Sequence, residues 1–134
     1  MLEHKIRRAG DVAIVDLNGR MSLTDTLWAG RGTVLLEVIR DLVNSGERKI
    51  LLNLAAVTYV DSSGIGDLAG AMTSVQNQNG QLKLLSPTPK VTEVLRFTRL
   101  DAFLEIRDDE NSAIQSFSSP TPHERTRVAN SSGN

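Results

Sequence analysis

One nearly continuous apolar run, KILLNL at residues 49–54, most constrains how this chain can fold. It has the length of a strand and lacks polar alternation, which is typical of a strand covered on both faces. Helical patterns flank it, because apolar residues recur every three to four positions over residues 34–43 and again over residues 65–75. A second apolar strand, QLKLLS at residues 81–86, follows. This order predicts strand–helix–strand units with parallel strands.

The two ends of the chain show other patterns. Leu2, His4 and Ile6 alternate with charged residues and are expected to form the dry face of a first strand. Gly10-Asp11 is expected to form a type II′ turn, with residues 12–17 as the returning strand. We therefore predict an α/β fold with a mixed β-sheet that opens with an antiparallel hairpin and has helices packed against it.

Toward the C-terminus the expected elements become shorter. A last strand is expected at residues 102–106 and a last short helix at residues 110–117. Residues 118–134 contain almost nothing to bury and are expected to form a flexible tail. With 134 residues in all, the chain suits one domain, which we place at residues 1–117.

Composition narrows the possible functions. The chain is 40% hydrophobic and 23% charged, as in soluble globular proteins, and its net charge of -1 gives no reason to expect a nucleic acid or membrane partner. Cysteine is absent, which excludes disulfides and thiolate metal sites. The N-terminal sequence MLEHKIRRAG does not resemble a secretory signal, so we expect a soluble, cytoplasmic protein.

The stretch VDSSGIGD at residues 60–67 raises the main functional question. Local chemistry favours a turn and helix cap, because Asp and Ser are good caps and Asp67 in the first turn would suit the helix dipole. One serine is enough to cap a helix, yet two occur together. We expect Ser63 to be the cap, which would leave the hydroxyl of Ser62 available at an exposed edge.

Parallel topology also predicts what surrounds this stretch. The loops that leave the carboxyl ends of parallel strands gather at one edge of the sheet, where ligands and partners usually dock. The loops expected there are residues 19–32, 55–63 and 87–90. Arg20, Arg31 and Lys90 could then lie near Asp61 and Ser62.

Signatures of enzymes are missing from the sequence. Neither His4 nor His123 is placed to act as the base for a nucleophilic Ser62 or Ser63, and no G-x-S-x-G elbow or P-loop is present. The acidic residues do not have the spacing of a calcium or zinc site. We therefore expect no enzyme, no cofactor and no metal.

The sequence VTYVDSSGIGDL, placed between KILLNL and NGQLKLL, resembles the STAS domains of bacterial anti-sigma-factor antagonists over about residues 2–117. The resemblance implies a mixed sheet with helices packed against it. It also implies a role in transcription regulation by partner switching. In that family, the first serine after the aspartate is phosphorylated by a serine kinase that is itself the anti-sigma factor.

Carried over to this sequence, the phosphorylated residue is Ser62. The unphosphorylated antagonist would bind the anti-sigma factor and release the sigma factor, and a PP2C-type phosphatase would restore it after phosphorylation. The residues expected to contact the partner are Asp61, Ser62, Ser63, Gly64, Ile65, Gly66, Ser22 and Thr24.

One stretch departs from the family pattern. Well-known antagonists carry a G-E-L-D-type turn after the second strand, and here Gly19-Arg20-Met21-Ser22 stands in its place. The following loop is also longer and contains Trp28, either a core residue or a partner contact. Two alternatives to the phosphorylation switch remain open. One is a STAS scaffold or subunit of a stress-signalling or lipid-transport assembly, and the other is a small nucleotide-binding or hydrolytic protein.

Overall fold

The computed structural model describes residues 2–22 and 34–118. Within them the sheet has five strands in the order β1-β2-β3-β4-β5. Strands β1 and β2 are antiparallel, and the remaining pairs are parallel. The predicted mixed α/β fold is therefore confirmed. The elements are β1 Glu3–Ala9, β2 Val12–Met21, α2 Val34–Asn44, β3 Lys49–Val60, α3 Ser62–Asn77, β4 Gln81–Leu85, α4 Pro89–Phe97, a 3₁₀ turn η1 Leu100–Ala102, β5 Glu105–Arg107 and α5 Glu110–Ser116.

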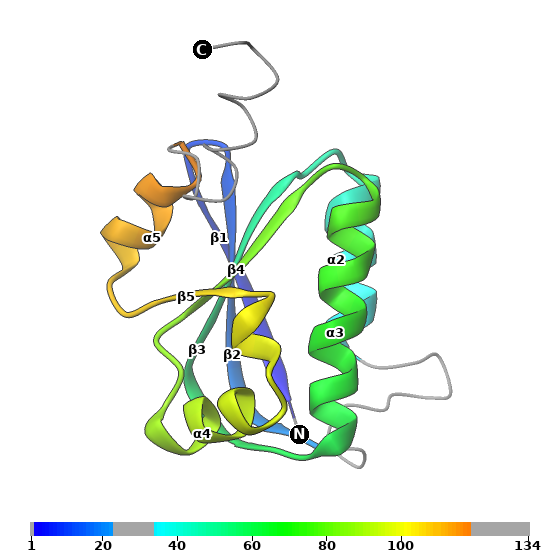
Figure 1. Cartoon of the computed structure of the whole chain (residues 1–134). Coiled ribbons are helices and arrows are strands. Elements are labelled where there is room, and N and C mark those ends of the chain that lie inside the picture. Colours follow the sequence, from blue (N-terminus) through cyan, green and yellow to red (C-terminus); the bar gives the residue numbers. More distant parts are fainter. Residues whose placement is uncertain (1, 23–33, 119–134) are drawn as a thin grey trace, which may run out of the picture.

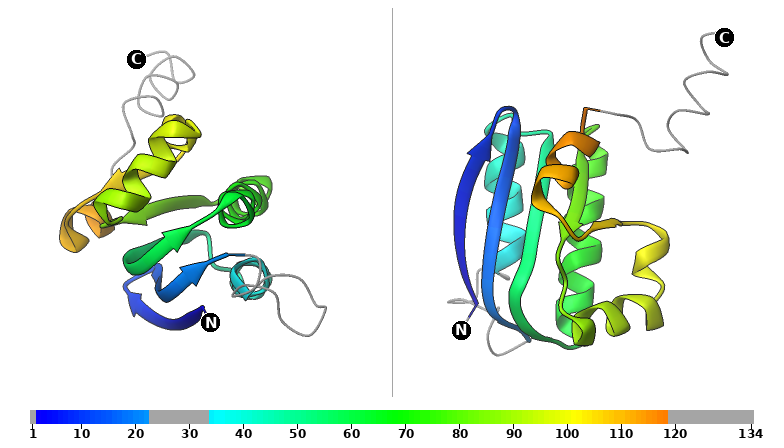
Figure 2. Two further views of the ribbon diagram at one scale, coloured as in Figure 1. Left: turned by 90° about the horizontal axis from the view of Figure 1, so that it is seen from below. Right: turned by 90° about the vertical axis from the view of Figure 1, so that its left-hand side faces the viewer.

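Helices cover both faces of the sheet (Figures 1 and 2). Helices α2 and α3 lie side by side on one face, and the short helix α5 lies on the other. Strand β3 shows why its apolar run is continuous: Ile50 and Leu52 belong to the larger core cluster, beneath α2 and α3, and Leu51 belongs to the cluster beneath α5. The expectation of a strand covered on both faces is thus confirmed.

The opening hairpin forms as predicted, with one correction. Gly10 has a φ of +62° at the turn, and Ala9 pairs with Val12 across it. The expected dry face of β1 is wrong beyond Leu2, because His4 is exposed and Ile6 is 44% exposed. Strand β1 is the edge of the sheet, and helix α2 does not cover the part of β1 that contains His4 and Ile6.

Strands β2 and β3 extend further than their apolar patterns indicated. The parallel pairing continues to Arg20 opposite Tyr59 and Met21 opposite Val60, across two register shifts. The segment expected as a loop from Ala55 is therefore strand as far as Val60. At the other end, the last strand is Glu105–Arg107 and the 3₁₀ turn occupies part of the segment predicted for it. The last helix begins at Glu110 as predicted.

An ion network connects the β1–β2 hairpin to α5, on the face of the sheet that α5 covers. The guanidinium of Arg7 donates to both carboxylate oxygens of Asp16, at 2.6 and 3.0 Å, and to Glu110 Oε1 at 2.7 Å. Asn53 Nδ2 donates to Asp16 Oδ1 at 2.8 Å. The hydrogen bonds from Arg7 lower the pKa of Asp16 and of Glu110, against the opposing effect of burial.

This network predicts acid sensitivity. Both carboxyl groups have depressed pKa values in the folded protein, so their contribution is present above the unfolded pKa of about 4 and is lost as the pH falls through the folded values. We expect Arg7→Met to lower the free energy of unfolding by roughly 1 kcal/mol at pH 7, since the network is partly exposed and screened. The difference from the wild type should shrink toward pH 2, measured by urea denaturation.

The exposed Arg40 of α2 provides the matched control. Arg40→Met removes the same charge and should change the pH dependence little. A difference between the wild type and Arg7→Met that stays constant down to pH 2 would show that the network does not titrate as described.

Candidate phosphorylation and partner-binding site

The turn between β3 and α3 is built around Asp61. Asp61 has an extended backbone and is the N-cap of α3, where its Oδ1 accepts a hydrogen bond from the backbone N–H of Gly64 at 3.1 Å. The backbone N–H of Asp61 donates to the carbonyl oxygen of Met21 at 3.2 Å. The cap therefore also joins the start of α3 to the end of β2.

The expectation that Ser63 caps the helix is wrong. Helix α3 begins at Ser62, so Ser63 is its second residue and lies inside the first turn, half-buried. The carboxylate of Asp61 occupies the capping position because Asp61 is the last residue with an extended backbone. Asp67 is also not in the first turn; it is 6% exposed and belongs to the buried side of α3.

With Asp61 as the cap, Ser62 is in an accessible position. Ser62 is exposed and is the first residue of α3. Helix α3 begins at the lower end of the sheet in Figure 1. Neither serine is required as a cap, because Asp61 performs that function. The predicted candidate is thus exposed at the positive end of a 16-residue helix.

Removal of the cap is expected to destabilise the domain. Asp61→Ala should lower the free energy of unfolding by about 1 kcal/mol, because the N–H of Gly64 loses its acceptor. Ser63→Ala should change it by less than about 0.5 kcal/mol. Urea denaturation of the two variants distinguishes the roles, and a larger loss for Ser63→Ala would contradict the assignment of the cap.

The other predicted contact residues differ in accessibility. Gly66 is exposed, and Ile65 is half-buried against the core. Gly64 is buried, and a Cβ built on it would lie 2.4 Å from the carbonyl oxygen of Met21. Ser22, at the end of β2, is 4% exposed. Of these predicted contact residues, the exposed ones therefore lie on the outer side of the first turns of α3.

Three of the predicted residues lie outside the described part of the chain: Thr24, Trp28 and Arg31. The other two expected cations, Arg20 and Lys90, do come together. Both lie over the ring of Tyr59, with Arg20 Cζ at 5.1 Å and Lys90 Nζ at 5.7 Å from its centroid. Sequence reasoning missed Tyr59, although an aromatic residue three positions before Ser62, in a segment expected at the binding edge, was a usable signal.

These observations agree with the comparison with known families. The family model for the STAS domain matches residues 4–113. The chain belongs to the STAS domain family. The resemblance seen in VDSSGIGD and its flanking strands is therefore confirmed.

Relatives of this STAS domain are named as anti-sigma factor antagonists. One from Thermotoga neapolitana is 35% identical over 78 residues, which cover 58% of this chain and 69% of that protein. A Thermotoga maritima antagonist of known crystal structure is 24% identical, with a TM-score of 0.72 over 86% of this chain and 94% of that chain. The Bacillus cell fate determinant SpoIIAA in its phosphorylated form is 21% identical, with a TM-score of 0.63 over 85% and 98% of the two chains. The two structures show a shared fold.

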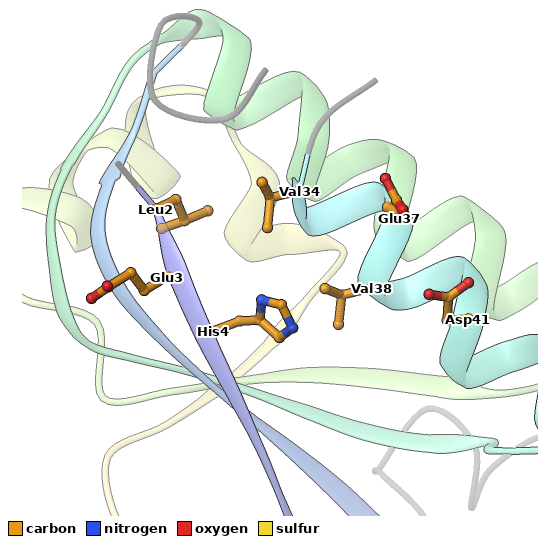
Figure 3. Close-up of a pocket in the computed structure, with 7 residues that line it drawn as sticks. All are labelled: Leu2, Glu3, His4, Val34, Glu37, Val38 and Asp41. Atoms are coloured by element: carbon orange, nitrogen blue, oxygen red, sulfur yellow. The ribbon is translucent and has the colours of Figure 1, made fainter. Parts of the chain in front are cut away.

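A cavity of about 500 Å³ lies elsewhere in this STAS domain, between β1 and α2. Figure 3 shows the His4 ring directed toward Val38 of α2, with Glu37 and Asp41 on the same helix. None of the residues that line it belongs to the Asp61–Gly66 turn. In the described ranges, no three acidic or histidine side chains are grouped to hold a metal ion, and no helix is long and apolar enough to cross a bilayer.

Proposed function

We propose that this STAS domain is an anti-sigma-factor antagonist that binds an anti-sigma factor with serine kinase activity and thereby releases a sigma factor. Phosphorylation of Ser62 switches the binding off, and a PP2C-type phosphatase restores it. The observation that carries the proposal is the exposed Ser62 hydroxyl at the first residue of α3, beside a cap supplied by Asp61. Relatives named as anti-sigma factor antagonists support the choice of partner.

The position of Ser62 suits a reversible phosphate. A phosphoserine adds about −1.5 to −2 charge, and the N-terminus of a helix tolerates an anion because its backbone N–H groups and dipole are positive there. The cap of Asp61 does not use the serine oxygen, so modification of Ser62 does not remove the acceptor of that hydrogen bond. The fold should therefore persist while an interface at this surface is lost through charge and bulk.

The solved phosphorylated SpoIIAA illustrates that a protein of this fold exists in a phosphorylated form. For this chain, the kinase to test is the histidine-kinase-like serine kinase of the same cell. We expect incubation with that kinase and ATP to add one phosphate at Ser62, located by mass spectrometry. Binding of the kinase, measured by calorimetry, should be present before the reaction and absent after it.

Variants of the two serines separate the site from its neighbour. Ser62→Ala should bind the kinase and accept no phosphate, and Ser62→Asp should bind poorly. Ser63→Ala should still be phosphorylated. Phosphate found at Ser63 with Ser62 unmodified would reject the site. Co-purification with transporter or scaffold subunits, without kinase binding, would favour a STAS scaffold that has no switch.

A further inference from the structure

Two cations and one aromatic ring form a cluster at the same end of the sheet as Ser62. Arg20 comes from β2, Tyr59 from β3 and Lys90 from the first turn of α4. Arg20 Cζ lies 5.1 Å and Lys90 Nζ 5.7 Å from the centre of the Tyr59 ring. Both distances are within the range of cation–π attraction. One ring therefore interacts with two positive groups, one from β2 and one from α4.

The backbone places this cluster next to the phosphorylation site. Arg20 directly precedes Met21, whose carbonyl oxygen accepts the hydrogen bond from the N–H of Asp61. Tyr59 is three residues before Ser62 in the same chain segment. Arg20 and Lys90 are exposed and Tyr59 is half-buried. Figures 1 and 2 show the beginnings of α3 and α4 at this one end of the sheet.

Helix α4 extends the exposed surface with an aromatic residue. Lys90, Glu93 and Phe97 follow at intervals of three and four, so they share one side of the helix, and all three are exposed. Phe97 is 89% exposed, although large aromatic side chains are usually well covered in a single domain. An exposed aromatic beside a charged cluster is the composition of a protein-binding surface, where aromatic residues supply much of the binding energy.

We infer that Arg20, Tyr59 and Lys90 form the docking point for an acidic segment of the protein that binds at Ser62. The inference rests on the proposed function, and it specifies that the contacting surface of the partner is negatively charged. An acidic protein is favoured over nucleic acid or anionic membrane because the chain as a whole carries a net charge of -1 and Phe97 offers an apolar contact on the same helix side.

The charge of the partner also gives the direction of the switch. A phosphate on Ser62 places negative charge at the edge where the partner presents its carboxylates. Like charges brought together in an interface are strongly unfavourable, so an acidic partner dissociates when Ser62 is phosphorylated. The cationic cluster thus attracts the carboxylates of the partner, and a phosphate on Ser62 repels them.

A titration with a model acidic peptide tests the cluster without any kinase. We expect N-acetyl hexaglutamate, added to the isotope-labelled full chain at low salt, to shift the NMR signals of Arg20, Tyr59 and Lys90 most. The shifts should disappear in Lys90→Glu and remain in Arg40→Glu, which makes the same charge change on the exposed face of α2. Shifts spread evenly over all exposed lysines and arginines would overturn the inference, as would tighter binding of single-stranded DNA or phosphatidylglycerol vesicles at the cluster.

The kinase provides the second readout. Lys90→Glu should weaken binding of the anti-sigma factor by about tenfold or more, and Arg40→Glu should leave it within about twofold. If Lys90→Glu binds the anti-sigma factor as tightly as the wild type does, the docking point is overturned and the proposed function stands. If the wild type binds no anti-sigma factor, the proposed function fails, and the peptide titration alone then decides whether the cluster binds acidic protein segments.

Discussion

Gly64→Ala is expected to lower the free energy of unfolding by about 3 kcal/mol, one of the two largest effects of any single change considered for this domain. A methyl group on Gly64 would lie 2.4 Å from the carbonyl oxygen of Met21 and 2.9 Å from both Met21 Cβ and Val60 Cγ1. The closest of these atoms is backbone, and it accepts the hydrogen bond that joins Asp61 to β2. The clash therefore cannot be relieved by a side-chain rotation.

Gly66 supplies a matched control two residues away in the same helix. A Cβ on Gly66 would meet no atom within 4 Å. Gly66→Ala should therefore stabilise the domain by about 0.5 to 1 kcal/mol, because alanine favours the helix more than glycine does. Urea denaturation measures both variants. A Gly64→Ala variant that is as stable as Gly66→Ala would show that the helix start absorbs the methyl group, and that the approach of β2 to α3 is not tight.

The contrast between these glycines shows what the sequence alone could reveal about the site. Gly64 and Gly66 lie two residues apart in the same short motif, and local sequence does not distinguish them. The structure assigns close approach within the domain to Gly64 and leaves Gly66 exposed. The difference depends on Met21, which is distant in sequence and reaches the turn only through the pairing of β2 with β3.

The fold was predictable where apolar patterning dominates. The apolar residues among 49–54 and the stripe of α2 lie in the core as their patterns require. Residues 55–60 were expected to belong to the loop that follows the apolar run, and they remain in the sheet because Asn18 to Met21 pair with them. Pairing between distant segments overrides local propensity, which is why strand ends are hard to place from sequence.

The position of Ser62 was predictable and its local role was not. Sequence order placed it at the start of a helix after a buried strand, as found. Which of three neighbouring polar residues becomes the cap depends on where the backbone changes from extended to helical, and that point shifted the cap from Ser63 to Asp61. The neighbouring cations were expected at this edge, but their common partner Tyr59 depended on the unexpected extension of β3.

Lys83 is a charged residue in the middle of an apolar strand, and the structure explains how it is buried. It is 3% exposed, and its Nζ donates to the carbonyl oxygen and to Oγ of Ser116, both at 2.9 Å. The same nitrogen lies 3.2 Å from Glu105 Oε2 and 4.7 Å from the centre of the Phe117 ring. Burial raises the pKa of Glu105, and the hydrogen bond from Arg107 and the charge of Lys83 more than offset it, so the pKa is lowered overall.

Lys83→Ala is expected to cost about 3 kcal/mol in the free energy of unfolding, because it leaves a cavity, removes the donor at the carboxyl end of α5 and deprives Glu105 of a buried partner. Lys83→Met retains most of the volume, and Glu105 keeps its 2.7 Å contact with Arg107 Nε, so the cost should be about 1 kcal/mol. Urea denaturation gives both values, and NMR titration of Glu105 in Lys83→Met should show its pKa rising.

The exposed Lys5 of β1 is the control, and Lys5→Ala should change the free energy of unfolding by less than about 0.5 kcal/mol. Equal losses in Lys83→Ala and Lys83→Met would mean that the charge, rather than the packing of its stem, dominates at this position. A loss in Lys83→Ala no larger than that in Lys5→Ala would contradict the anchoring of α5 by Lys83. Helix α5 has only seven residues and is too short to be stable in isolation, so its place on the sheet depends on such contacts.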